Sequence, residues 1–188
     1  MTRMFVHLRL HSEFSVVDGI NRIDDVVKVA SKDQQPALAV TDLNNMFGAI
    51  KFYKAARGKG VKPVLGAEIY LESLSQDASQ LSRMILLVQS HQGYLNLCEL
   101  LARGWTQNVH KAVAVIKLEW LRELSQGLIA LSGAQAGALG QALVQGDTTR
   151  AGEVALLMAG IFPHRFYIEL QRAGRPDDET HVSAAVQL

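Results

Sequence analysis

The stretch PALAVTDLNNMFGAIKFYKAARGKGVKPVLGAEIYL, residues 36–71, contains the unit that decides the fold. Its apolar run at residues 37–41 predicts a short buried strand, and residues 46–57 follow with the period of a helix. Residues 61–71 are again strand-like. A strand, a helix and a second strand in this order are typical of a parallel βαβ unit.

The same alternation continues on both sides of this unit. Further strands are expected at residues 5–10, 83–89, 127–132 and 165–170, and further helices at residues 22–31, 94–103, 136–143, 148–160 and 177–188. The segment 73–82 is polar and is predicted to be a loop. The pattern predicts an α/β fold with mostly parallel strands, most of a small barrel, whose chemistry is expected where the strands end.

The composition is that of an ordinary globular domain. Apolar residues make up 48% and charged residues 20%, and 188 residues suffice for one sizeable core. The net charge of +1 gives no bulk electrostatic reason to bind nucleic acid or membrane. A single cysteine fits a reducing compartment, and no run approaches the about 20 apolar residues of a membrane span. We therefore expect a cytoplasmic location and no membrane partner.

Histidines alternate with apolar residues in FVHLRLHSEFS, residues 5–15. Because a strand has a period of two residues, His7, Arg9 and His11 are predicted to point to the same side. Histidines on one strand face suit a metal cluster, but the guanidinium of Arg9 has no lone pair to offer a cation. This stretch is therefore either no metal site or a metal site that has been dismantled.

A family resemblance rests on several segments in order: HLRLHSEFSVVDG, the stretch at residues 36–68, QGYLNLCELLARG, GLIALSG and RFYIELQRAGRPDDE. Together they closely resemble the PHP (polymerase and histidinol phosphatase) domain of the alpha subunits of bacterial DNA polymerase III. The resemblance implies a distorted (β/α) barrel whose active members bind zinc or manganese and act as phosphoesterases or exonucleases. We expect residues 1–188 to be the N-terminal portion of such a domain, because the apolar stripe of the last predicted helix still continues at Leu188.

The resemblance places the metal ligands of the family on defined positions of this chain: Arg9, His11, Asp18, Asp42, Leu43, Glu68, Arg83 and Ala173. Four of these, Arg9, Leu43, Arg83 and Ala173, cannot act as the expected ligands. Losing four ligands should abolish tight metal binding, because a multi-metal site needs several converging N and O donors. This degenerate pattern resembles proteobacterial members whose PHP domain has lost catalysis. We therefore expect neither a catalytic residue nor a metal cofactor in this chain.

The two arginines suggest what replaced the metals. We expect Arg9 and Arg83 to pair with Asp18 and Glu68, because carboxylates left without a cation in a cleft would be costly. For individual residues, simpler structural roles remain open. Asp42 suits a helix cap or a turn, and Glu68 suits an ordinary ion pair.

An alternative is a working metal-dependent phosphoesterase or 3'-5' exonuclease. It would bind zinc or manganese through His7, His11, Asp18, Asp42 and Glu68. The two arginines would then contact phosphate, which a guanidinium suits well. His7, however, falls outside the ligand pair of the family, and it is better explained as a histidine on a strand face.

The resemblance also implies a role and partners. We expect a non-catalytic structural module of a replicative polymerase, which binds the proofreading exonuclease (epsilon) subunit and the rest of the replicase. The parent enzyme would use magnesium in a polymerase domain outside this chain. A basic run offers candidate phosphate or DNA contacts, although such faces are commonly just solvated: Lys51, Lys54, Arg57 and Lys59. His91, His110, His164 and His181 are predicted to lie in loops or on exposed faces.

Overall fold

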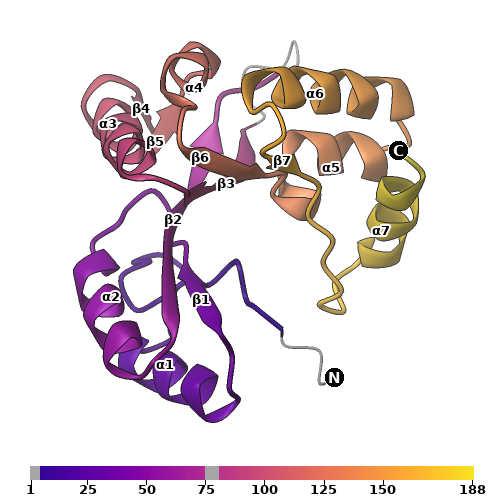
Figure 1. Cartoon of the computed structure of the whole chain (residues 1–188). Coiled ribbons are helices and arrows are strands. Elements are labelled where there is room, and N and C mark those ends of the chain that lie inside the picture. Colours follow the sequence, from indigo (N-terminus) through magenta and orange to yellow (C-terminus); the bar gives the residue numbers. More distant parts are fainter. Residues whose placement is uncertain (1–4, 75–80) are drawn as a thin grey trace. The chain divides into compact units, whose positions relative to one another are not determined.

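The computed structural model describes residues 5–74 and 81–188 (Figure 1). It divides the chain into two compact units, Met1–Glu68 and Ile69–Leu188. Most of the loop predicted at 73–82 lies outside the described residues. Within the described part of the chain, we find no helix with the length and apolar character needed to span a membrane.

The first unit contains the predicted βαβ arrangement. Its elements are α1 (Ile23–Lys32), β1 (Ala37–Val40), α2 (Ala49–Gly58) and the first part of β2 (Lys62–Leu71). Strand β1 pairs with β2 in parallel, with Val40 opposite Leu65. The two helices contact each other beside this pair of strands. The prediction for residues 36–71 is therefore confirmed, and α2 begins three residues later than expected.

A single apolar cluster holds the first unit together. Both helices, β1 and the residue before β2 contribute buried side chains to it: Ile23, Val27, Ala30, Leu38, Val40, Phe52, Ala56 and Val61. The period of 3.6 residues brings Ile23, Val27 and Ala30 to one face of α1. Burial of each large apolar side chain stabilises the fold by about 1.5–3 kcal/mol.

The strand predicted at residues 5–10 is present only as an extended segment. His7 forms one isolated parallel bridge with Leu38. Further along, the backbone N–H of Leu10 donates to the side-chain Oγ1 of Thr41 at 3.0 Å. Because that bond goes to a side chain instead of a backbone carbonyl, the ladder is interrupted and no regular strand forms.

The second unit begins within β2 and continues with a mixed sheet and several helices. Its elements are β3 (Ser82–Val88), α3 (His91–Gln107), β4 (Val109–His110), β5 (Val113–Ile116), α4 (Leu118–Leu124), β6 (Leu128–Leu131), a 3₁₀ helix (Ala134–Ala136), α5 (Ala138–Val144), α6 (Thr148–Ile161), β7 (Phe166–Tyr167) and α7 (Asp178–Gln187). The strand order is β4-β5-β2-β3-β6-β7. The β2–β5 and β6–β7 pairs are parallel, whereas the β3–β6 and β4–β5 pairs are antiparallel.

Helix α3 packs closely against the loop that precedes β6. Ser90 caps the helix by accepting a hydrogen bond from the N–H of Gly93 at 3.2 Å. A Cβ atom on Gly93 would lie 1.8 Å from the carbonyl oxygen of Gly127. This position therefore requires glycine, because any side chain would collide with backbone.

Some expectations for the second unit are wrong. No element was predicted for residues 109–124, which form β4, β5 and α4, and the strand expected at 165–170 has only two residues. His181 is fully buried on α7 instead of exposed, and neither of its ring nitrogens has a hydrogen-bond partner among the described residues. Burial lowers the pKa of His181, although Asp178 and Glu169 favour its charged form.

Candidate functional site: a charged cluster around Glu68

Glu68 of β2 is the centre of a charged cluster in the first unit. Its side chain is 0% exposed, and Arg9 contacts both of its carboxylate oxygens. Nη2 of Arg9 donates to Oε1 at 2.7 Å, and Nε donates to Oε2 at 3.1 Å. A guanidinium and a carboxylate that meet through two parallel bonds form a strong and well-oriented pair. The pairing predicted between Arg9 and Glu68 is therefore present.

His11 joins Glu68 to a second carboxylate. Its Nε2 lies 2.7 Å from Oε2 of Glu68, and its Nδ1 lies 2.9 Å from Oδ1 of Asp18. An ionised carboxylate only accepts hydrogen bonds, so two such contacts require both ring nitrogens of His11 to carry a proton. Burial opposes this charge, but the hydrogen bonds and attraction from Glu68 and Asp18 outweigh it and raise the pKa of His11.

Asp42 fixes the position of the chain that carries His11. Its Oδ1 accepts a hydrogen bond from the N–H of Ser12 at 2.6 Å, and its Oδ2 accepts one from the hydroxyl of Ser12 at 2.8 Å. Burial raises the pKa of Asp42, although both bonds from Ser12 favour the charged form. The helix-cap interpretation of Asp42 is wrong, because α2 follows Gly48 without a side-chain cap.

A second serine, Ser15, holds the carboxylate of Asp18 in place. Its hydroxyl donates to Oδ1 of Asp18 at 2.7 Å and accepts a hydrogen bond from the N–H of Leu43 at 3.0 Å. Leu43 in turn forms a parallel bridge with Glu68. Sequence reasoning assigned no positioning role to Ser12 or Ser15. The sequence shows that both serines are close to His11 and Asp18, but it does not show that Ser12 bonds Asp42 and that Ser15 bonds Leu43.

The remaining ligand positions lie in the second unit. On β3, Arg83 donates from Nη2 to the hydroxyl of Tyr70 at 2.8 Å, and its guanidinium carbon lies 5.0 Å from the centre of that ring. Ala173 donates its backbone N–H to Asp178 at 2.7 Å. A pairing of Arg83 with a carboxylate of the first unit stays a prediction. In the first unit, the ring of His7 packs edge-on against Phe5, with centroids 4.7 Å apart.

The chemistry of the cluster does not fit a metal ion as the side chains stand. A metal at Glu68 would have to displace Arg9, and a metal at His11 would have to remove a proton from a ring nitrogen held by a carboxylate. Within residues 5–74 and 81–188, no group of three or more His, Cys, Asp or Glu side chains is arranged to hold a metal. The cluster can thus stabilise a loop through charge.

The basic run on and after α2 is only partly paired. Lys51 forms an ion pair with Glu13 at 2.6 Å and lies 3.7 Å from Asp24. Three other candidate phosphate contacts are exposed to solvent: Lys54, Arg57 and Lys59. The guanidinium of Arg57 lies 5.9 Å from the centre of the Tyr53 ring.

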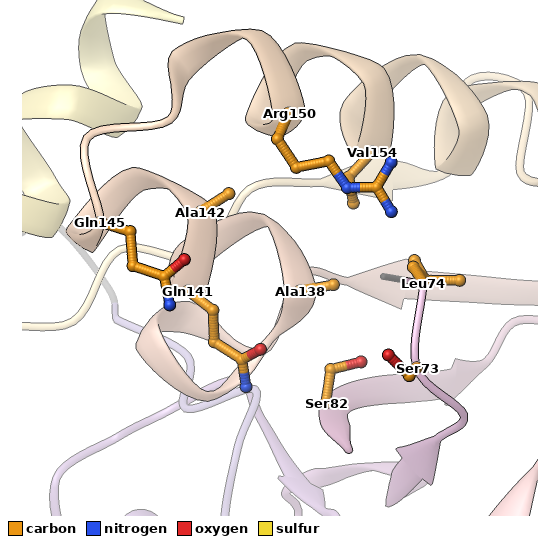
Figure 2. A pocket seen from close by; sticks show the side chains of 9 residues that line it. All are labelled: Ser73, Leu74, Ser82, Ala138, Gln141, Ala142, Gln145, Arg150 and Val154. Carbon is orange, nitrogen blue, oxygen red and sulfur yellow. The ribbon is translucent and has the colours of Figure 1, made fainter. Parts of the chain in front are cut away.

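A separate small pocket of about 60 Å³ lies in the second unit (Figure 2). The figure shows Arg150 of α6 on one side of it, Gln141 of α5 and Gln145 directly after α5 on another, and the hydroxyl groups of Ser73 and Ser82 opposite them. Among the residues that the structure describes, the buried Oγ of Ser82 has no hydrogen-bond partner. None of the predicted ligand positions lines this pocket, so it is not part of the charged cluster.

The fold and the placement of the cluster define an α/β protein of the PHP type. The chain belongs to the PHP domain family, which residues 7–173 match. A crystal structure of a candidate metal-dependent phosphoesterase from Bifidobacterium adolescentis superposes on 98% of this chain and 84% of its own, with a TM-score of 0.57 and 11% identity. That likeness supports the predicted fold class.

The chain is also similar to the DNA polymerase III subunit alpha of proteobacteria. It is 46% identical to that of Pseudomonas aeruginosa over 188 residues, which is 100% of this chain and 16% of the relative. It is 39% identical to that of Escherichia coli K12 over 185 residues, 98% of this chain and 16% of the relative. The predicted resemblance is confirmed, and the chain spans about one sixth of the length of these relatives.

Proposed function

We propose that this chain is the PHP portion of a replicative DNA polymerase III alpha subunit and acts there as a non-catalytic structural module. One observation carries the non-catalytic part. Glu68, a buried carboxylate at a metal-ligand position of the family, is bound by Arg9 and by His11.

The energetics of this cluster favour a structural role. A buried carboxylate without a partner is expensive, and losing one partner of a buried pair typically costs about 3–5 kcal/mol. Arg9 and His11 supply the positive charge that metal ions would otherwise bring to Glu68. Catalysis by a bound metal additionally requires free coordination positions for water and substrate. The observed bonds leave the cluster suited to holding residues 9–18 against β2.

The proposed partners are based on the similarity to the relatives. Proteins called subunit alpha act within an assembly, and we propose that this domain binds the proofreading exonuclease (epsilon) subunit in the cytoplasm. Catalysis by the parent enzyme would use magnesium in the region outside the match. Any DNA contact by Lys54, Arg57 and Lys59 would be weak or indirect. The support for these partners is the similarity to the polymerase subunits, which covers all of this chain.

Metal analysis tests the non-catalytic proposal. The purified chain is dialysed against trace zinc and manganese, and its metal content is then measured together with phosphoesterase activity. We expect substoichiometric metal and no activity. The variant Arg9→His combined with Leu43→His restores histidine at two ligand positions, so it is expected to retain more metal than the natural chain. Stoichiometric metal in the natural chain, with hydrolysis of a phosphoester, would establish the phosphoesterase alternative instead.

Binding to the exonuclease subunit is tested separately. The chain is titrated with the purified proofreading exonuclease subunit of the same organism in a calorimeter. We expect a saturable complex whose formation does not depend on added zinc or manganese. If no heat of binding appears at micromolar concentrations of both proteins, the docking role is wrong, and the structural role in the polymerase chain stands on the metal result alone.

A further inference from the structure

The outward face of α2 carries large apolar side chains, whereas the outward face of a surface helix is usually polar. Ile50 and Tyr53 lie three residues apart on this helix and are 61% and 45% exposed, and Phe47 in the turn before it is 72% exposed. Residues spaced by three or four share one side of a helix. The opposite side, with Phe52 and Ala56, already packs on the core. A surface with several large exposed apolar side chains commonly marks an interaction site.

The same face is strongly basic. The segment 46–62, with Lys62 included, carries five Lys and Arg residues and neither Asp nor Glu. Lys54 and Arg57 fall on the side of α2 that Ile50 and Tyr53 occupy, and both are exposed. Arg57 also lies over the ring of Tyr53, 5.9 Å from its centre. The surface therefore combines apolar anchors with positive charge.

Two classes of partner could match a basic and apolar surface, and the residues favour one of them. Single-stranded nucleic acid uses aromatic rings for base stacking, and phosphate binding needs only charge. Ile50 can neither stack on a base nor bind a phosphate. It nevertheless lies between Phe47 and Tyr53 along the chain and is more exposed than Tyr53. Aromatic and arginine side chains around an aliphatic anchor are instead typical of protein interfaces. The side chains of an exposed helix such as α2 form ridges and grooves into which those of a second helix can pack.

We propose that this surface of α2, formed by Phe47, Ile50, Tyr53, Lys54 and Arg57, binds an acidic amphipathic helix of a partner protein. Apolar side chains of that helix would cover Ile50 and its aromatic neighbours. Its Asp and Glu residues would lie beside Lys54 and Arg57, which complements their charge. This inference deepens the docking role proposed above by assigning it a place and a partner chemistry.

A synthetic peptide tests the surface without the exonuclease subunit. The probe is a fluorescein-labelled helical peptide with leucine at positions i, i+3, i+4 and i+7 and glutamate at the flanking positions. It is titrated with the chain at about 0.15 M salt, where electrostatic interactions are screened over about 8 Å. We expect saturable binding that weakens about tenfold in Ile50→Ser and again in Arg57→Glu. The matched control is Lys28→Glu on the exposed face of α1, which should bind as the natural chain does. Thermal unfolding confirms that each variant is folded.

Two results would overturn the proposal. One is the absence of peptide binding, or peptide binding that Ile50→Ser and Arg57→Glu leave unchanged. The other is tight binding of a single-stranded oligonucleotide that the same variants abolish, which would assign the surface to nucleic acid. Because the exonuclease titration is separate, peptide binding without exonuclease binding would contradict the partner proposed above and leave this surface assignment intact.

Discussion

Replacement of Arg9 by methionine tests the idea that this side chain stabilises a buried carboxylate. Methionine keeps much of the length of arginine but removes both hydrogen bonds to Glu68. The carboxylate of Glu68 remains 0% exposed and keeps His11 as a cationic neighbour. Folding then has to bury this negative charge with less compensation.

The expected loss follows from the geometry of the pair. Removing one partner of a buried ion pair lowers the free energy of unfolding by about 3–5 kcal/mol. Because Glu68 keeps its contact with His11, we expect a smaller loss of about 2–3 kcal/mol. For a chain of this length, such a loss lowers the midpoint of thermal unfolding by about 5–10 °C. The loss should be larger at high pH, because His11 then gives up its proton and no longer compensates the charge of Glu68 in the variant.

Urea unfolding at pH 6 and pH 9 measures these free energies. The control is Arg122→Met on α4, an exposed arginine whose loss should change stability by less than about 0.5 kcal/mol. Glu68→Gln in the Arg9→Met background should recover part of the loss, because it removes the buried charge itself. The reasoning is refuted if Arg9→Met loses no more than the control at either pH.

Other perturbations give equally specific expectations. Since the pKa of His11 is raised on folding, its contribution to stability is complete below its unfolded pKa of about 6.5 and is lost as the pH rises through the folded value. Urea midpoints should therefore fall between pH 6 and pH 9 in the natural chain and fall less in His11→Asn. Ser12→Ala removes a buried hydrogen bond to Asp42 and should cost about 1–3 kcal/mol, as calorimetry can show. Gly93→Ala forces a Cβ against backbone and should cost at least about 1–3 kcal/mol, whereas Gly152→Ala on α6, with open space around it, should be neutral or slightly stabilising by thermal unfolding.

The βαβ unit was predictable because its signals are long and local. The apolar run at residues 37–41 and the helical period that follows it need no knowledge of distant contacts. The segment 5–10 also has a local signal, the alternation of apolar and polar residues that is typical of a strand. A hydrogen bond from Leu10 to the side chain of Thr41 nevertheless interrupts its pairing with β1. Strands β4 and β7 have two residues each, which is too short for any periodic signal.

The centre of the charged cluster was also predictable in part. The resemblance placed Arg9, His11, Asp18 and Glu68 at related positions, and the structure brings all four together. The bonds of Ser12 to Asp42 and of Ser15 to Leu43 could not be predicted, because these partners lie about 30 residues away along the chain. His181 was predicted to be exposed, because its neighbours in the sequence do not reveal that α7 buries it.

The pairing of Arg9 with Glu68 also restricts how such a chain could change over generations. A single substitution at position 9 leaves a buried carboxylate short of one cation, and a single histidine there gives a metal too few ligands to bind tightly. A first step toward a metal site at position 9 therefore weakens folding before any ion can compensate for it. Once an internal arginine has taken this place, selection for a stable domain preserves it.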